Sequence, residues 1–320
     1  MNVLIYAETA EGTFKKTALE AIFYGSKVAE KTGGKSIVLA IGPGEQAEMA
    51  KAGNYGAEKV LHAQGDQLDT ANIAAYAEVL VAAAQKSEAE LIVTAKSSLA
   101  DAVTARAAGA LKAGIVGNVT DLPDLSNGFK VKRSIFTGKA FAETTIQSPT
   151  KIVALKKNAV SAEASTQTAE VEGFSVDLDA GLFSTKVVET IKAKGEVPLP
   201  EADLVVSGGR GMKGPEHWQP LLDLAEALGA STACSKPVSD MDWRPHHEHV
   251  GQTGVKIAPN LYIACGISGA IQHLAGVNAS KVIVVINTDP EAPFFKAADY
   301  GIVGDVFEVL PKLTAAVKAL

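Results

Sequence analysis

Two stretches of the sequence decide the fold. Leu204–Gly214 reads LVVSGGRGMKG, and Leu261–Leu274 reads LYIACGISGAIQHL. Each begins with a short apolar run, passes through glycines and small polar residues, and leads into a segment with helical spacing. Such an order predicts a buried parallel strand followed by a loop whose backbone can approach a phosphate at a helix N-terminus. Two such loops predict a doubly wound sheet with a dinucleotide lying across its strand ends.

The first loop satisfies a dinucleotide fingerprint only in part. Its glycines at 209, 211 and 214 have the spacing G-x-G-x-x-G. An NAD site also needs an acidic residue about 20 residues later, at the end of the next strand, to hold a ribose. Here that strand, expected at Ala230–Cys234, runs into Ser235 and Lys236, which suit a phosphate or an electron-rich ring better. An NAD(P)-dependent oxidoreductase using Gly209–Gly214 remains an alternative.

Further polar groups follow the other predicted strands of this half. Val250–Gly254 (VGQTG) places an amide and a hydroxyl between two glycines, where they can bind the edge of a heterocycle. The strand expected at Lys281–Asn287 ends on an amide, and Asp305 precedes the last helix as a candidate ribose or adenine partner.

The chain as a whole alternates strand and helix patterns, which predicts an α/β fold with parallel sheets. In the first half, strands are expected at 3–7, 36–42, 59–62 and 91–94, and helices at 16–31, 46–52, 72–85 and 99–111. Strands at 130–136, 140–147 and 151–155 are expected to form an antiparallel meander, and 158–172 an exposed linker. In the second half, strands are expected at 204–207, 230–234, 261–265 and 281–287, and helices at 215–228, 268–274 and 306–320.

Gly195–Pro200 contains two prolines and is the expected domain boundary. The sequence therefore predicts an N-terminal α/β domain at 1–196, with a parallel sheet plus antiparallel strands, and a C-terminal doubly wound domain at 197–320.

Composition excludes several classes of protein. Of 320 residues, 47% are hydrophobic and 21% charged, as in ordinary globular chains. The net charge of −6 argues against a nucleic-acid partner, because such proteins usually carry a basic stripe. Two cysteines cannot build a disulfide framework and fit a reducing compartment. With neither a signal peptide nor an apolar run of membrane-spanning length, we expect a cytoplasmic protein without membrane insertion.

Several conspicuous residues have structural explanations. His246–His249 (HHEH) places four potential ligands side by side, which rarely share one tetrahedral metal ion, so a solvated loop is expected rather than a metal site. Cys234 and Cys265 end predicted buried strands and are expected in the core. Trp218 and Trp243 are expected to be packing residues, although Trp243 could border a ligand.

The motifs together resemble those of the electron transfer flavoprotein α subunit. The resemblance rests on GGRG (208–211), VGQTG (250–254), GISGAIQHLAG (266–276), INTDPEAPFF (286–295) and ADYGIVGD (298–305). It is dense over residues 204–320 and mostly architectural over 1–200.

This resemblance implies one FAD in the C-terminal domain and no catalytic or metal-binding residue. It places Arg210 near the flavin ring or the pyrophosphate, Thr253 at flavin N5 and His273 at flavin O2. Ser235 and 251–253 would meet the flavin and ribityl chain, 268–273 the pyrophosphate and ring, and Asn287 and Asp305 the adenosine half. The candidate FAD-binding residues are Arg210, Ser235, Lys236, Val250, Gly251, Gln252, Thr253, Gly266, Ser268, Gly269, Ala270, Ile271, Gln272, His273, Asn287 and Asp305.

One position departs from the family, which usually has Ser-Arg where this chain has Ser235-Lys236. Lysine keeps the positive charge but lacks the planar, stacking guanidinium. We therefore expect a weaker and less directional stabilisation of the reduced, anionic flavin.

The function that the resemblance implies is electron carriage rather than catalysis. The chain would be one subunit of a heterodimer, with its N-terminal domain as scaffold and interface for a β subunit. Electrons would pass from flavin dehydrogenases, such as the acyl-CoA dehydrogenases of fatty acid β-oxidation, to a membrane quinone oxidoreductase or another acceptor. A bifurcating type remains open. A nucleotide sensor acting through the N-terminal domain is a further alternative, but the loop Glu8–Gly12 after its first strand carries one glycine and two acids.

Overall fold

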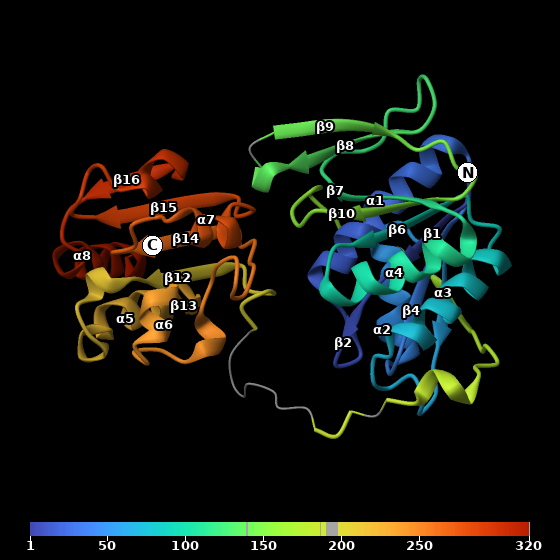
Figure 1. Cartoon of the computed structure of the whole chain (residues 1–320), viewed down its shortest axis with the longest axis horizontal. Helices are drawn as coiled ribbons and strands as arrows, with labels where there is room; N and C mark the ends of the chain where they lie inside the picture. Colours follow the sequence, from blue (N-terminus) through green and yellow to red (C-terminus); the bar gives the residue numbers. More distant parts are fainter. Residues whose placement is uncertain (139, 186, 190–197, 320) are drawn as a thin grey trace. The chain divides into compact units, whose positions relative to one another are not determined.

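The computed structural model describes residues 1–138, 140–185, 187–189 and 198–319. The chain divides into two compact units, Met1–Thr190 and Ile191–Leu320 (Figure 1). The boundary predicted between residues 196 and 197 lies outside the described residues. Each unit is a mixed α/β structure with a large parallel sheet, as the sequence predicts.

The first unit is built on a nine-stranded sheet in the order β11-β5-β4-β1-β6-β10-β7-β8-β9. Its strands are β1 (Val3–Tyr6), β2 (Thr9–Ala10), β3 (Thr13–Phe14), β4 (Ser36–Ile41), β5 (Lys59–Ala63), β6 (Leu91–Ala95), β7 (Gly114–Val119), β8 (Lys130–Ile135), β9 (Ala140–Thr145), β10 (Lys151–Leu155) and β11 (Glu170–Gly173). Its helices are α1 (Lys16–Thr32), α2 (Gln46–Ala50), α3 (Ile73–Lys86) and α4 (Ser98–Leu111), with 3-10 turns η1 (Lys51–Tyr55), η2 (Phe136–Gly138) and η3 (Ala180–Phe183). The small strands β2 and β3 form a separate hairpin.

Helices cover both faces of this sheet because its central strands are apolar on both sides. In β1, Val3 and Ile5 pack with α1, whereas Leu4 and Tyr6 pack with α3 and α4. Successive residues of a strand point to opposite faces, so a continuous apolar run serves two cores at once.

The predicted antiparallel meander is only half correct. β8 and β9 pair antiparallel, but β10 lies between β6 and β7 and is parallel to both. Four successive residues of β10, Ile152–Leu155, are fully buried, whereas no two successive residues of β8 are buried and β9 alternates between half-buried and exposed residues. A continuous apolar run is typical of an interior parallel strand, and the glycine-containing partner β7 was not predicted.

The predicted linker at 158–172 is also partly wrong. Its end forms the edge strand β11, which pairs parallel with β5, and Ala169 is buried against the core. Glu172 forms ion pairs with Lys59 and Lys86, which fix this edge to the unit. The preceding residues 163–168 are exposed, as expected.

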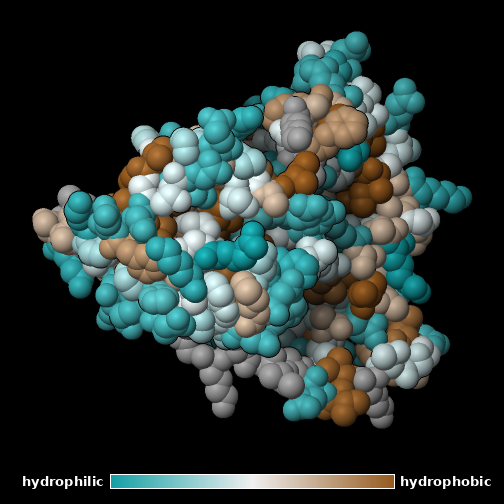
Figure 2. Space-filling model, turned by 60° about the vertical axis from the view of Figure 1, so that its left-hand side comes forward, coloured by the Kyte–Doolittle hydropathy of each residue, from teal (hydrophilic) through white to brown (hydrophobic). Residues whose placement is uncertain are grey.

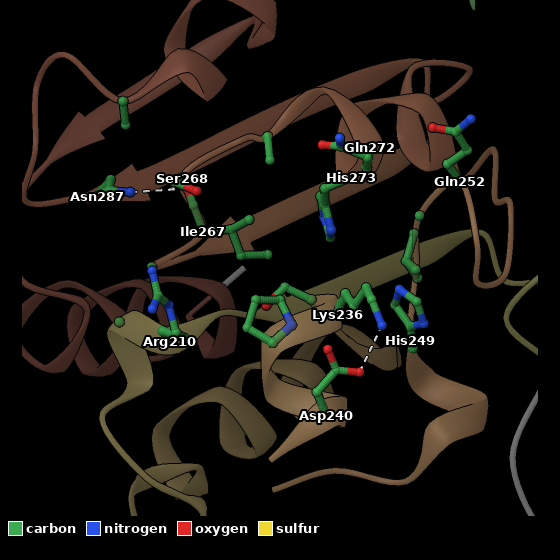
Figure 3. A pocket seen from close by; sticks show the side chains of 18 of the residues that line it. Arg210, Lys236, Asp240, His249, Gln252, Ile267, Ser268, Gln272, His273 and Asn287 are labelled. Atoms are coloured by element: carbon green, nitrogen blue, oxygen red, sulfur yellow. Dashed lines mark hydrogen bonds and ion pairs between the residues drawn. The ribbon is translucent and has the colours of Figure 1, made fainter. Parts of the chain in front are cut away.

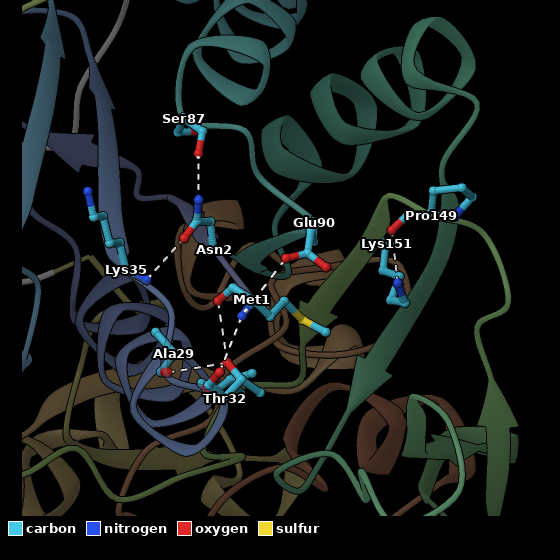
Figure 4. A network of polar contacts seen from close by, with 10 residues as sticks. Met1, Asn2, Ala29, Thr32, Lys35, Ser87, Glu90, Pro149 and Lys151 are labelled. Carbon is cyan, nitrogen blue, oxygen red and sulfur yellow. Dashed lines mark hydrogen bonds and ion pairs between the residues drawn. The ribbon is translucent and has the colours of Figure 1, made fainter.

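Polar contacts fix the beginning of β1 (Figure 4). The Asn2 side chain donates to the Ser87 carbonyl at 3.2 Å and accepts from the Lys35 backbone N–H at 3.2 Å. The Thr32 hydroxyl donates to the Met1 carbonyl at 3.3 Å. The first residues therefore join the ends of α1 and α3 to the sheet.

The second unit is a five-stranded, wholly parallel sheet in the order β13-β12-β14-β15-β16. Its strands are β12 (Leu204–Gly208), β13 (Ser231–Cys234), β14 (Leu261–Cys265), β15 (Val282–Asn287) and β16 (Tyr300–Val303). Its helices are α5 (Gln219–Leu228), α6 (Lys236–Asp240), α7 (Ile271–Val277) and α8 (Val306–Lys318), with 3-10 turns η4 (Arg210–Met212), η5 (Pro215–His217), η6 (His246–Glu248) and η7 (Pro293–Ala297). Strand β16 and helix α6 were not predicted.

The strand order of this second sheet creates a switch point. From β12 the chain moves to β13 on one side and then returns to β14 on the other side. Helices α5 and α8 cover one face, and α7 and η7 cover the other, so the doubly wound prediction is confirmed. Ligands of such sheets bind outside the carboxyl ends of the strands where the order reverses, here between β12 and β14.

Figure 2 shows hydrophilic and hydrophobic side chains interspersed over the face that it displays. Within the described residues, no helix has the length and apolar character needed to cross a membrane.

Candidate functional site

A cavity of about 670 Å³ opens at the switch point of the second unit (Figure 3). Its walls come from the loops that follow β12, β13, β14 and β15 and from the segment 249–253. This volume is typical of small-molecule sites. The lining candidates from the sequence are Arg210, Ser235, Lys236, Val250, Gly251, Gln252, Thr253, Gly266, Ser268, Ala270, Gln272, His273 and Asn287.

Three candidates do not line the cavity. Gly269 packs against Phe294, and Ile271 is 57% exposed. Asp305 accepts a hydrogen bond from the Phe307 backbone N–H at 3.0 Å, which caps α8, and forms an ion pair with Lys213 at 3.4 Å. Its carboxylate is thus already engaged in a structural role.

Sequence reasoning missed several lining residues, namely Gly211, Pro237, Asp240, His249, Ile267, Asp289 and Ala292. Two of these had a signal. Asp240 is four residues after Lys236, which is the spacing of neighbours on one helix face. His249 directly precedes the predicted loop at Val250, but it was assigned to a solvated histidine loop.

Two of the glycines after β12, Gly209 and Gly211, pack against the loop that follows β14. Gly209 N–H donates to the Cys265 carbonyl at 2.9 Å, and Gly211 N–H donates to the Gly266 carbonyl at 3.0 Å. A Cβ on Gly209 would lie 2.3 Å from the Gly266 oxygen, and one on Gly211 would lie 2.6 Å from the Gly266 Cα. The two strand-end loops therefore cross in contact, and neither N–H is free for a phosphate, contrary to the prediction for this loop.

In the loop after β14, by contrast, carbonyl groups are engaged in hydrogen bonds and N–H groups are free. Two of its carbonyl oxygens accept hydrogen bonds from neighbouring segments. Asn287 Nδ2 donates to the Ile267 oxygen at 3.0 Å, and Phe294 N–H donates to the Ser268 oxygen at 3.1 Å. The backbone N–H groups of residues 268–272 donate no hydrogen bond within the described parts of the chain. A run of free N–H groups beside the cavity is a suitable binding site for an anion.

Charged side chains of both signs reach the cavity (Figure 3). Arg210 extends from the loop after β12, and Lys236 begins α6. The Lys236 ammonium lies 2.8 Å from Oδ1 of Asp240, and both side chains are more than half exposed. Asp240 therefore offsets part of the positive charge that the sequence assigned to Lys236.

Two histidines face the cavity and are almost fully buried. His273 Nε2 lies 2.7 Å from the Tyr262 hydroxyl, and Nδ1 of both His249 and His273 is buried without a hydrogen bond of standard geometry. Burial lowers the pKa of His273 most, the nearby His249 lowers it as well, and a backbone hydrogen bond with Val250 opposes them, which together give a pKa of about 4. Burial likewise lowers the pKa of His249. Both rings are therefore neutral at pH 7.

The buried state of His273 predicts a loss of stability in acid. Its pKa is about 4 when folded and near 6.5 when unfolded. Between these values the unfolded chain binds more protons, so the free energy of unfolding falls as the pH falls from 6.5 to 4, by up to about 3 kcal/mol. Urea unfolding at pH 7 and pH 4.5 measures this. The variant His273→Gln should show a smaller difference between the two pH values; an unchanged difference would contradict the assignment.

The histidine loop is less solvated than predicted. His246 and His247 are exposed, but Glu248 and His249 are each 2% exposed. Glu248 is held by Arg244, and Ser239 contacts His246 Nδ1 at 3.1 Å. No three metal-ligating side chains of the described residues are placed to hold a metal ion.

The cysteines and tryptophans are core residues. Cys234 and Cys265 are buried, and burial raises the pKa of each thiol to about 12, which keeps both inert as nucleophiles. Trp218 is buried, and Trp243 packs against the same core without lining the cavity.

The corresponding switch point of the first unit, between β1 and β6, is occupied by its own side chains. Glu8 follows β1, lies 2.7 Å from the Lys15 ammonium and hydrogen-bonds to Ser97. The Glu8 side chain is only 9% exposed. A carboxylate at this position repels phosphate, which argues against the nucleotide sensor.

Comparison with known proteins decides the family. The family model for the electron transfer flavoprotein domain matches residues 3–179, and that for the electron transfer flavoprotein FAD-binding domain matches residues 198–278. The chain belongs to the electron transfer flavoprotein α-subunit family. Electron transfer flavoproteins carry electrons and bind FAD, and the second of these models covers most of the cavity.

Individual relatives match along their whole length. The electron transfer flavoprotein subunit alpha of Bacillus subtilis (strain 168) is 36% identical over 320 residues, which cover 100% of this chain and 98% of the relative. That of Thermoanaerobacterium thermosaccharolyticum is 35% identical, with coverage of 100% and 98%. Protein FixB of Clostridium saccharobutylicum is 35% identical, with coverage of 100% and 97%.

The residues present suit FAD. The free N–H groups at 268–272 and the cationic Arg210 match a pyrophosphate. The amides of Gln252 and Gln272, which line the cavity, match the hydrogen-bonding edge of a flavin. The cavity of this electron transfer flavoprotein subunit thus carries groups that suit an anionic, aromatic dinucleotide.

Proposed function

We propose that the chain is the α subunit of a heterodimeric electron transfer flavoprotein that holds FAD in the cavity at the β12–β14 switch point. It accepts electrons from flavin dehydrogenases, such as acyl-CoA dehydrogenases, and passes them to a quinone oxidoreductase or another acceptor. The observation that carries the proposal is the convergence of free backbone N–H groups, two cationic side chains and two buried histidines on one cavity of that size.

The residues divide the work by chemistry. The loop at 268–272 and Arg210 bind the pyrophosphate. Asn287 fixes that loop in position by donating a hydrogen bond to the Ile267 carbonyl. Thr253, Gln252 and His273 orient the ring through hydrogen bonds, with Thr253 at N5 and His273 at O2. FAD supplies the redox chemistry, and reduction gathers negative charge on its ring, which nearby donors and cations stabilise.

The partner in this proposal is a β subunit that binds the N-terminal unit. The relatives are named as alpha subunits, which supports assembly with a second chain. The first unit also exposes Phe136 (75%) and Phe141 (55%) around the β8–β9 turn, and such apolar surface suits a protein contact.

Co-purification tests the proposal. The chain is expressed with and without its β partner, and the nucleotide released by denaturation is identified and counted. A yellow complex that releases FAD is expected. A colourless complex that still contains the β partner would contradict the proposal.

The same experiment also tests two alternative functions. An NAD(P)-dependent oxidoreductase using Gly209–Gly214 would oxidise NAD(P)H with the α chain alone, but the N–H groups of Gly209 and Gly211 are engaged by the β14 loop. The bifurcating type carries a second FAD in the β subunit, so two FAD per heterodimer would favour it over the ordinary type.

Charge at Lys236 and Asp240 is expected to set the potential of the bound flavin. Asp240→Asn removes the carboxylate that offsets Lys236 and should raise the potential. Lys236→Arg should raise it as well, by adding a planar guanidinium. Exposed charges contribute about 0.2–1 kcal/mol, which corresponds to shifts of about 10–40 mV for one electron.

Spectroelectrochemical titration of the FAD-loaded complex measures both shifts. Glu30→Gln is the matched control, because it removes one carboxylate from an exposed lysine pair on α1 in the other unit. Potentials that are unchanged in both pocket variants would contradict the assigned role of this pair.

A further inference from the structure

Asp289 lies just past the carboxyl end of β15 and lines the cavity. It is exposed, and its backbone N–H donates to Oδ1 of Asn287 at 3.0 Å, so the two residues belong to one turn. Figure 3 shows Asn287 at one end of the pocket, and Gln252 and His249 toward the other end. Asp289 therefore belongs to the end of the cavity that lies away from Gln252 and His249.

The two residues that the family resemblance places at the adenosine half of FAD are already engaged in other contacts. Asn287 uses its Nδ2 for the Ile267 carbonyl and its Oδ1 for the N–H of Asp289. Asp305 caps α8, pairs with Lys213 and does not line the cavity. A nucleoside at this end of the cavity therefore needs a further polar partner.

The carboxylate of Asp289 can supply this partner. Its Oδ1 accepts the backbone N–H of Glu291 at 2.9 Å, and among the described residues no cation pairs with the carboxylate and Oδ2 accepts no hydrogen bond. The other acidic residue in the lining, Asp240, lies 2.8 Å from the Lys236 ammonium. A carboxylate has about four lone-pair positions, so Asp289 can still accept hydrogens from a ligand.

The position of Asp289 relative to the loop after β14 matches the acidic residue of a dinucleotide-binding unit. In such a unit a phosphate-binding loop and a helix follow one strand, and an acidic residue at the end of the neighbouring strand binds the ribose hydroxyls. Here the loop with the free N–H groups and α7 follow β14, and β15 lies beside β14 in parallel. Asp289 follows Gly269 by about 20 residues, which is the spacing typical of such units.

The same spacing leads to no acidic residue when it is counted from the loop after β12. It then leads to Ser235 and Lys236, which follow β13. The N–H groups of Gly209 and Gly211 are also engaged by the loop after β14. The phosphate-binding loop and its acidic partner therefore belong to β14 and β15, and not to β12 and β13.

We propose that the carboxylate of Asp289 binds the 2′ and 3′ hydroxyls of the ribose in the adenosine half of the bound dinucleotide, and that it selects nucleotides in which this ribose is unmodified. The proposal rests on the proposed function, in that the dinucleotide is FAD. Both hydroxyls donate to the carboxylate oxygens, and hydrogen bonds to a charged acceptor are stronger than neutral ones. A phosphate on either hydroxyl would bring a second anion against Asp289, which disfavours its binding.

Nucleotide fragments test this contact without flavin. The full chain, freed of nucleotide, is titrated calorimetrically with ADP and with 2′-deoxy-ADP, which differ in one ribose hydroxyl and share the diphosphate. We expect ADP to bind about tenfold more tightly, because the deoxy fragment lacks one hydrogen bond to a charged acceptor. Equal affinities for the two fragments would overturn the proposal.

The variant Asp289→Asn tests the residue itself, with Glu291→Gln as its matched control. Asparagine can still accept the N–H of residue 291 through Oδ1, so the turn is retained. Glu291 is also exposed, but it does not line the cavity. Asp289→Asn should lose most of the preference for ADP over 2′-deoxy-ADP and bind FAD about tenfold more weakly. Its affinity for FMN, which lacks the adenosine half, should be unchanged. Glu291→Gln should change none of these affinities.

The outcomes separate the two proposals. Equal losses of FAD and FMN affinity in Asp289→Asn, or a Glu291→Gln variant that behaves in the same way, would indicate a structural or long-range charge effect and overturn the ribose contact. Unchanged FAD affinity in Asp289→Asn would also overturn the ribose contact and leave the proposed function in place. A wild-type chain that prefers ADP through Asp289 but binds no FAD, even with its β partner, would support the ribose contact and contradict the proposed function instead.

Discussion

Replacing Arg244 with methionine is expected to lower the free energy of unfolding of the second unit by about 3–5 kcal/mol. Arg244 donates to Glu248 through two nitrogens, Nε at 2.9 Å and an η nitrogen at 2.5 Å. The Glu248 side chain is only 3% exposed, and the guanidinium also lies over the Trp218 ring at 5.2 Å. Removing the arginine leaves a buried carboxylate without its cation, which costs far more than losing an exposed pair.

The effect should extend to cofactor binding. Glu248 directly precedes His249, and the N–H of the next residue, Val250, donates to the Cys234 carbonyl at 3.0 Å, which joins the 249–253 segment to β13. This segment forms one wall of the cavity. Weakening its anchor should therefore reduce the affinity for FAD as well as the stability.

Chemical denaturation followed by tryptophan fluorescence measures the loss, because both tryptophans lie in the second unit. Lys213→Met is the matched control: it removes one cation from an exposed pair with Asp305 in the same unit and should cost less than about 1 kcal/mol. The double variant Arg244→Met/Glu248→Leu should recover much of the loss, since it leaves no buried charge. Equal losses of unfolding free energy in Arg244→Met and Lys213→Met would show that the Arg244–Glu248 pair does not stabilise the second unit more than an exposed pair does.

Replacing Gly269 with alanine is expected to destabilise the second unit by about 2–5 kcal/mol and to weaken FAD binding at least about tenfold, since αL strain and overpacking add together. Gly269 has a φ of +84°, in the left-handed region, and an added Cβ would lie 2.5 Å from both Cβ and the backbone nitrogen of Phe294. Phe294 N–H holds the Ser268 carbonyl, so a displaced Phe294 releases the loop that carries the free N–H groups.

The variant Gly229→Ala separates the cost of backbone strain from the cost of a steric clash. Gly229 ends α5 with a φ of +62°, but an added Cβ there would meet nothing within 4 Å. We expect a cost of about 1 kcal/mol for this variant and no change in FAD affinity. Denaturation midpoints and FAD titrations of both variants test the difference. If Gly269→Ala behaved like Gly229→Ala in both measurements, the contact with Phe294 would not determine the position of the loop at 268–272.

The sequence predicted most of the second unit because its signals are local. The apolar runs at 204–207 and 261–265 each occupy a buried parallel strand, and the glycines after them follow directly in the chain. Residues that follow parallel strands meet at the same edge of a sheet, so the loops that line the cavity were found from order along the chain, and the family resemblance supplied the individual residues.

The failures concern pairings between distant segments. Strand β10 was placed beside β9 because the two are adjacent in sequence, but its partners β6 and β7 lie earlier in the chain. Strand β11 is short and polar, and it pairs with β5 across about a hundred residues. Lys236 was predicted to keep the positive charge of the family arginine, and the turn of helix that begins with it brings Asp240, which was not considered, to within 2.8 Å of its ammonium.

By itself the sequence determined the fold class, the family resemblance and the cofactor, because these depend on residue types in a fixed order along the chain. Only the tertiary structure decided what each glycine and each polar group does. Gly209 and Gly211 are required by the crossing with Gly266, and their N–H groups are used there, whereas those of 268–272 remain free. Likewise, the partner of His273 is Tyr262, eleven residues away, and the distance between the two follows from the packing of α7 on β14. The physical reason is that a hydrogen bond depends on position in space, which packing sets, and not on spacing in the sequence.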